Sequence, residues 1–159
     1  MNEKWLIALL PIVAGLLAIV PVIKADNVNV TATVPPYVSV VFNYSAVNYG
    51  QVSATGVTDL AAPNQDSGIY NVTVVTNVPL NVSAYRTAWS PSGLLTLKFA
   101  VGTSVPTAPQ VELTTNSLVV ATLTTTGQYT HYHGYWLTIP SNTPAGTYST
   151  TVTITYQPA

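Results

Sequence analysis

The chain has 159 residues, of which only four are Lys or Arg and five are Asp or Glu, so its formal net charge is -1 and 6% of it is charged. Four cations cannot build a basic surface that neutralises several phosphates, which excludes sequence-independent nucleic-acid binding. The absence of cysteine excludes disulfides, thiolate zinc sites and a cysteine nucleophile.

Residues 1–25 have the pattern of an export segment. A short charged start, Met1 to Lys4, precedes a long run without a charge, and Lys24-Ala25 ends it. The pattern fits a signal peptide cleaved after Ala25, which we favour. It also fits a retained membrane anchor, because the uncharged run would span about 28 Å as a helix, close to the hydrocarbon thickness of a bilayer. Both interpretations place residues 26–159 outside the cell, with membrane contact only through this segment.

After residue 25 the composition favours strands. Thr and Val, whose branched side chains suit a pleated sheet, occur 24 and 20 times in 134 residues. No window there keeps the helical apolar spacing for more than a turn. We therefore predict an all-β fold, with an Ig-like or jelly-roll two-sheet sandwich over residues 37–159. The expected strands are 27–34, 37–44, 49–53, 69–78, 80–89, 94–101, 111–114, 118–125, 129–139 and 146–157.

The first expected strand, residues 27–34, alternates strictly between apolar and polar side chains. Pro35 and Pro36 end it and form a stiff hinge, so residues 26–36 make a separate segment of donor strand and linker. Such a strand either folds into its own sandwich or completes the sheet of a neighbouring subunit. The second arrangement is head to tail and builds a filament if its rotation does not close. The apolar donor face would consist of Val28, Val30, Ala32 and Val34.

Four Asn-x-Ser/Thr sequons follow the start of the mature chain, at Asn29, Asn43, Asn71 and Asn81. The two-residue period places Asn71 and Asn81 opposite the apolar side chains of their strands, where a glycan would face solvent. We expect N-glycosylation there, with Asn43 as a further candidate. Asn29 is disfavoured, because a buried donor strand leaves little room for a sugar.

Two later features predict how the strands are arranged. Pro79 separates two alternating runs and cannot donate to a ladder, so it predicts a crossing between sheets or an edge. In the last expected strand, one parity is mostly apolar or aromatic and is expected to face inward. That parity consists of Tyr148, Thr150, Val152, Ile154 and Tyr156.

Residues 129–136 contain two candidate constellations. His131 and His133 fall on one side of a strand, but a zinc site needs a third protein ligand, and only four carboxylates follow residue 25. We therefore expect no metal and no cofactor. The aromatic residues of this run form either a sugar-stacking platform or a core and subunit-contact strand. They are Tyr129, Tyr132, Tyr135 and Trp136.

Catalytic motifs are not found in the sequence. Glycoside hydrolysis needs two facing carboxylates, whereas Asp59 and Asp66 flank a short run that is typical of a solvated turn. A Gly-x-Ser-x-Gly nucleophile elbow does not occur. We expect that the protein is not an enzyme.

Three short motifs carry a family resemblance: Val-Asn-Tyr-Gly at 47–50, Val-x-Thr-Asn-Val at 74–78 and Pro-Ala-Gly-Thr-Tyr at 144–148. Together with the leader and the alternating first strand, they make residues 26–159 resemble the secreted fibre subunits related to TasA and camelysin. The resemblance is strongest in character to the archaeal bundling-pilus subunits of that group. It implies a jelly-roll subunit whose N-terminal strand, residues 27–34, inserts into the next subunit.

The leading hypothesis is thus a glycosylated, secreted pilus subunit that forms a cell-surface homopolymer by donor-strand complementation. Its partners would be copies of itself and neighbouring filaments in bundles, in support of adhesion or biofilm. The alternative is a secreted or membrane-tethered carbohydrate-binding module built on residues 129–136. Without residues 1–25 the net charge is -2, and an uncharged Thr, Ser, Asn and Tyr surface favours assembly because neighbouring copies repel each other little.

Overall fold

The computed structural model describes residues 31–52 and 56–159. The predicted export segment and the donor-strand residues Val28 and Val30 lie outside the described residues. The chain divides into two units between Val34 and Pro35. In the first unit, residues 31–34 form no strand, and 76% of Val34 is exposed. The described end of the predicted first strand therefore pairs with no other strand among the described residues.

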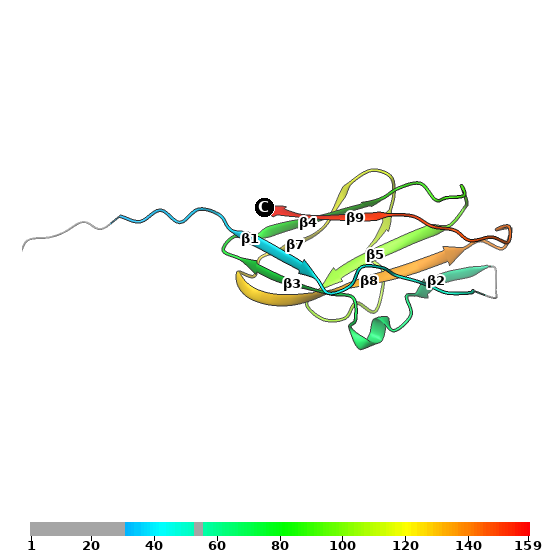
Figure 1. Ribbon diagram of the computed structural model, residues 1–159, viewed down its shortest axis with the longest axis horizontal. Coiled ribbons are helices and arrows are strands. Elements are labelled where there is room, and N and C mark those ends of the chain that lie inside the picture. Colours follow the sequence, from blue (N-terminus) through cyan, green and yellow to red (C-terminus); the bar gives the residue numbers. More distant parts are fainter. Residues whose placement is uncertain (1–30, 53–55) are drawn as a thin grey trace, which may run out of the picture. The chain divides into compact units, whose positions relative to one another are not determined.

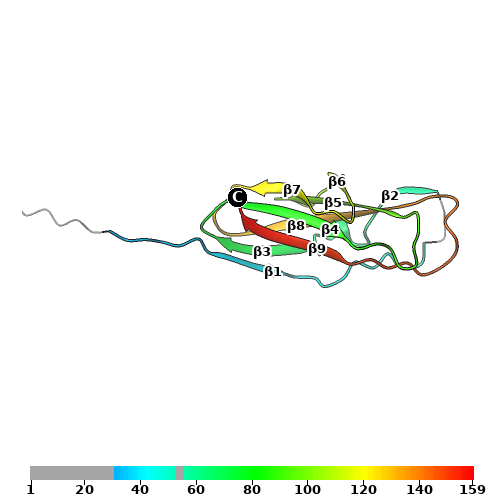
Figure 2. The same ribbon diagram turned by 90° about the horizontal axis from the view of Figure 1, so that it is seen from above.

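Residues 35–159, which we call the β domain, form two antiparallel sheets (Figure 1), and β4 and β9 of the smaller sheet lie side by side (Figure 2). This confirms the all-β prediction and is compatible with a sandwich. The larger sheet has the order β1 (Val38–Phe42), β3 (Asn71–Thr76), β8 (Gly127–Ile139), β5 (Thr96–Gly102) and β6 (Val111–Leu113), with β2 (Val57–Ala61) also paired to β8. The smaller sheet has the order β7 (Leu118–Leu123), β4 (Leu80–Arg86) and β9 (Val152–Pro158).

Two of the expected strands, 49–53 and 146–157, differ from the observed ones. Residues 49–52 form no strand, and β2 forms further along the chain instead. The alternation of β2 is hidden in the sequence, because its register shifts between Val57 and Leu60 and Asp59 adopts a positive φ of 53°. The last strand begins at Val152 rather than residue 146, because the preceding residues form no continuous ladder but an isolated bridge between Ser90 and Ser149 and a bond from the Thr87 amide to the Thr151 carbonyl.

Pro79 lies at the crossing between the two sheets, as the sequence predicted. Strand β3 ends before it in the larger sheet, and β4 begins after it in the smaller sheet. The neighbouring Asn77 holds the chain that enters β1, since its side chain accepts a hydrogen bond from the Tyr37 amide at 2.7 Å and donates one to the Pro35 carbonyl at 2.9 Å. The hinge residues Pro35 and Pro36 are themselves exposed.

The core lies between the sheets, and β8 is buried on both of its faces. On the inner face, Phe99 of β5 is fully buried against Tyr135 of β8. On the outer face, Trp136 is buried beside Pro106. Gln65 comes from the short 3-10 helix Gln65–Ser67, and its side chain accepts a hydrogen bond from the Tyr135 amide at 2.6 Å. Within the described residues, no helix has the length and apolar character that crossing a membrane requires.

Lys98 forms an ion pair with Asp59, with 2.8 Å between Nζ and Oδ1. Both side chains are about one third exposed, with relative areas of 29% and 34%. Because solvent screens such a pair, we expect Lys98→Met to lower the free energy of unfolding by at most about 1 kcal/mol. Urea unfolding of the purified protein measures this change. A loss above about 2 kcal/mol would contradict a solvated pair.

Candidate functional site

The smaller sheet ends at β9, and among the described residues no strand pairs with the outer edge of β9. In the run leading into it, Ser149 exchanges backbone hydrogen bonds with Ser90 at 2.8 and 3.0 Å, and the Thr87 amide donates to the Thr151 carbonyl at 2.9 Å. Backbone groups alternate between the two sides of an antiparallel strand. The amide and carbonyl groups of Thr150, Val152, Ile154 and Tyr156 therefore point away from β4 and the segment that follows it. An edge of this kind is a template for another strand.

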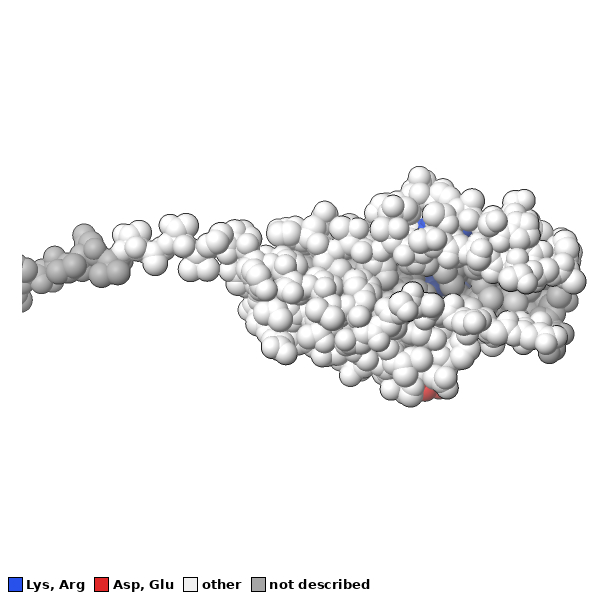
Figure 3. All heavy atoms as spheres, viewed as in Figure 1, with Lys and Arg blue, Asp and Glu red and all other residues white. Residues whose placement is uncertain are grey.

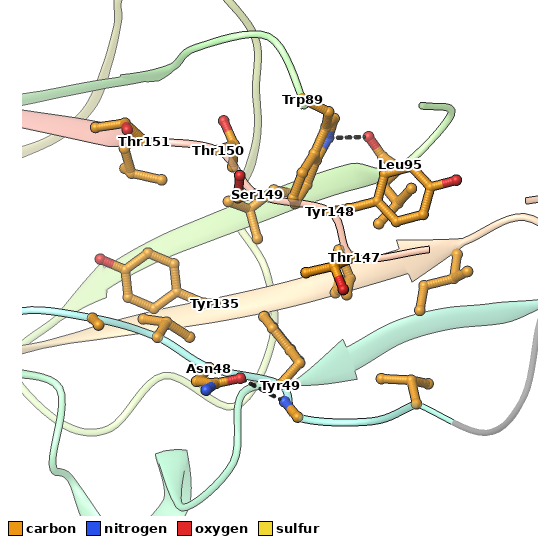
Figure 4. A pocket seen from close by; sticks show the side chains of 18 of the residues that line it. Asn48, Tyr49, Trp89, Leu95, Tyr135, Thr147, Tyr148, Ser149, Thr150 and Thr151 are labelled. Carbon is orange, nitrogen blue, oxygen red and sulfur yellow. Dashed lines mark hydrogen bonds between the residues drawn. The ribbon is translucent and has the colours of Figure 1, made fainter. Parts of the chain in front are cut away.

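A cleft of about 1320 Å³ lies between this edge and residues 42–52, which follow β1. The apolar side chains at its base come from the two neighbouring central strands, Leu97 from β5 and Leu137 from β8. Figure 4 shows Trp89 and Tyr148 close together at one end of the cleft, where the Trp89 indole donates to the Leu95 carbonyl at 2.6 Å. The cleft is thus bounded on one side by the strand that has unpaired backbone groups.

The uncharged lining of the cleft suits an extended peptide that carries apolar side chains. None of the described residues that line it is charged. The hydroxyl groups of Tyr49 and Thr143, both lining residues, are buried without a hydrogen-bond partner among the described residues. Buried polar atoms are nearly always paired in folded proteins. An extended peptide would supply apolar contacts to the uncharged lining of the cleft and main-chain groups to its strand edge.

Beside the cleft, the two histidines enter a network of tyrosine hydroxyls. His131 and His133 lie on one face of β8, as alternation predicted, and are 0% and 1% exposed. Their Nε2 atoms lie 2.5 and 2.8 Å from the Tyr156 hydroxyl. The Tyr44 hydroxyl contacts Nδ1 of His133 and lies 2.6 Å from the Tyr135 hydroxyl. Within the described residues, no group of three His, Cys, Asp or Glu side chains is close enough to hold a metal ion.

Burial keeps this network neutral. Burial lowers the pKa of His131 to about 4, and burial together with repulsion from His131 lowers the pKa of His133 to about 3. The pKa values of the Tyr44 and Tyr156 hydroxyls are raised, mainly because burial disfavours the phenolate. Near neutral pH the network therefore consists of uncharged imidazoles and phenols.

The four aromatic residues proposed as a sugar platform do not form one. Tyr135 and Trp136 are each 3% exposed. Strand alternation directs Tyr129 and Tyr135 toward the core and Tyr132 and Trp136 to the other face of β8. The physical reason is that odd-numbered and even-numbered residues of one strand point to opposite faces of the sheet. They therefore cannot form one flat surface, and here both faces of β8 are covered.

The sequons are placed differently from one another. Asn43 is exposed, and its side chain donates to that of Asn71. Asn71 in turn donates to the Gly68 carbonyl at 2.8 Å, and Asn81 accepts from the Thr122 hydroxyl at 2.8 Å. Asn71 and Asn81 are partly exposed, whereas the residues next to them in their strands are buried. This agrees with the alternation that the sequence predicted for them. Because Asn43 and Asn71 contact each other, one glycan would displace the other side chain.

Sequence reasoning did not single out the residues at the ends of the cleft. Tyr148 was expected to face inward with the last strand, and it packs against a core cluster with Trp89. Nothing in the local sequence pattern indicated that these two residues border the cleft. Asp59 and Asp66, the pair considered for hydrolysis, lie in an ion pair and in the short 3-10 helix, respectively.

Comparison of the chain with protein-family models finds no match, and comparison with curated protein sequences finds none either.

Proposed function

We propose that the chain is a secreted structural subunit that polymerises head to tail into an extracellular filament. Residues 27–34 of one copy would enter the cleft of the next copy and pair with the open edge of β9. The observation that carries the proposal is this unpaired edge beside an uncharged cleft, in a domain whose smaller sheet has three strands against six in the other. The added strand would complete an Ig-like or jelly-roll sandwich.

The dimensions of the two partners agree. An eight-residue strand is about 26 Å long, and the run from Thr147 to Ile154, which lines the cleft, also has eight residues. In the donor, Val28, Val30, Ala32 and Val34 would cover the apolar base of the cleft. The donor main chain would satisfy the outward amide and carbonyl groups of β9, which is how strand addition supplies affinity.

The surface suits repeated contact between copies. The face in Figure 3 shows few charged atoms, and residues 26–159 contain two cationic and four acidic side chains. Weak repulsion lets such surfaces meet end to end and side by side, which favours filaments that bundle and support adhesion or biofilm. The partners in this proposal are copies of the same chain, with the N-terminal segment as the only membrane contact before processing.

Deleting residues 26–34 tests the proposal. We expect the truncated protein to be secreted and folded but to leave no filaments in electron micrographs of the cell surface, because it lacks the strand that the next cleft receives. The matched control is Thr31→Ser with Thr33→Ser, which changes only the polar face of the donor and should leave filaments intact. Filaments of undiminished number and length after the deletion would refute the proposal.

A further inference from the structure

The chain has two histidines, and the structure places both in the core of the β domain. They belong to β8 of the larger sheet, and both contact the hydroxyl of Tyr156 in β9 of the smaller sheet. The imidazole rings of His131 and His133 also lie nearly parallel to the Tyr156 ring, with interplanar angles of 22° and 17°. This cluster therefore joins the two sheets at the strand that borders the cleft.

Neutral rings satisfy the hydrogen bonds to the Tyr156 hydroxyl better than protonated rings do. A neutral imidazole donates from one nitrogen and accepts at the other, so the Tyr156 hydroxyl can accept from one ring and donate to the other. Protonation makes every ring nitrogen a donor. Nε2 of a protonated His133 could then no longer accept the proton of the Tyr156 hydroxyl. A protonated His131 would carry a buried donor at Nδ1, which has no partner among the described residues.

Within residues 31–52 and 56–159, no charged side chain is among the groups that contact the two rings. Their contacts come from Tyr129 and Tyr135 of β8, Tyr44 after β1, Phe99 of β5 and Tyr156 of β9. Phe42 also packs against His133, and Tyr70 completes the ring of tyrosines around Tyr44. Each of these groups is an uncharged phenol or a phenyl ring near neutral pH. An imidazolium formed here would be a buried charge without compensation, which strongly destabilises a folded protein.

The rest of the chain contributes little to an acid response. In most proteins, acid unfolding follows the protonation of many paired carboxylates. Residues 26–159 contain four acidic side chains, and within the described residues the one ion pair is the solvated pair of Asp59 and Lys98. The buried histidine pair is therefore expected to dominate the dependence of stability on pH.

We propose that His131, His133 and Tyr156 form an acid-sensitive latch between the two sheets. Protonation of the imidazoles leaves the Tyr156 proton without an acceptor and places an uncompensated charge between the sheets, which detaches β9, the strand whose open edge borders the cleft. The consequence for assembly rests on the proposed function: acid would remove one wall of the cleft, release the inserted strand and shorten filaments.

The direction of the effect follows from the pKa values. Burial lowers the pKa of the folded histidines from 6.5 to about 4 and about 3, so the unfolded chain binds more protons over that interval. The stability contributed by the neutral pair is complete above about pH 6.5 and is lost as the pH falls toward 4 and below.

Urea unfolding of the mature protein, followed by intrinsic fluorescence at about pH 7.5, 5.5 and 4.5, tests the latch. We expect the wild-type midpoint to fall stepwise with pH. The double variant His131→Gln with His133→Gln removes both titrating groups and should lose more than half of that fall, whereas Asp59→Asn should keep it. An equal fall in the double variant, or no fall in the wild type, would overturn the proposal.

A second measurement needs no variant. In the wild-type protein, NMR titration of the histidine ring protons should show both rings neutral down to about pH 5. Ordinary titration near pH 6.5 in the folded state would overturn the latch.

The two proposals fail separately. If no filaments form near neutral pH, the proposed function fails, and the unfolding and NMR data on the monomer still decide the latch. If filaments form and keep their length at about pH 4, where both imidazoles begin to protonate, release of β9 by acid is refuted.

Discussion

Gly134→Ala is expected to lower the free energy of unfolding of the β domain by about 3 kcal/mol, because it overpacks a site that is already full. Gly134 lies on the outer face of β8, beneath the ring of Trp136. A Cβ atom there would come within 2.6 Å of Cζ3 of Trp136 and 3.1 Å of Cβ of Pro106. Trp136 is 3% exposed, so its ring can move aside only by displacing buried neighbours.

Thermal or urea unfolding measures this loss, and Gly146→Ala is the matched control. A Cβ atom at Gly146 would meet only the Tyr148 ring, at 3.6 Å or more, which is an ordinary van der Waals contact. We expect the control to change the free energy of unfolding by less than about 0.5 kcal/mol. Equal stability of the two variants would mean that the Trp136 ring is not held against Gly134.

Thr150→Pro is expected to abolish assembly while the β domain stays folded. The amide of Thr150 lies between two residues whose backbone groups face the segment that follows β4, so it points to the open edge. Proline removes that donor and places its ring where an added strand would pair, and edge strands tolerate proline where the amide faces outward. Filament yield in electron micrographs and the sedimentation of secreted protein measure the effect, which we expect to exceed about tenfold.

Thr150→Ala is the control for the same position. It keeps the backbone donor and removes the hydroxyl that donates to the Thr87 carbonyl at 2.8 Å. It should assemble as the wild type does, with a stability loss of about 1 kcal/mol. Normal filaments from the proline variant would show that strand addition does not use this edge, even if deletion of residues 26–34 blocks assembly.

Much of the architecture was predictable from local patterns. The excess of Val and Thr predicted an all-β domain, and Pro79 predicted the crossing from one sheet to the other. Alternation placed His131 and His133 on one face and directed Val152, Ile154 and Tyr156 inward, where they pack on the core. These features follow from the two-residue period of strands and the missing amide of proline, so they need no knowledge of distant partners.

Other features depend on contacts between segments far apart in the chain. Strand β2 is irregular and forms only because the end of β8 pairs with it. Trp136 and Pro106 both lie against Gly134, and Tyr135 and Trp136 are buried, so the alternative of a sugar-stacking platform at residues 129–136 is not supported.

By itself, then, the sequence determined the strand-forming character of the chain, its scarcity of charge and the alternation of residues 27–34. Only the tertiary structure decided that β9 has an open edge, that a cleft lies beside it and that the two histidines meet Tyr156. The physical reason is that periodicity tells which side of a strand a residue occupies, whereas the partner on that side is set by how the sheets are ordered and packed.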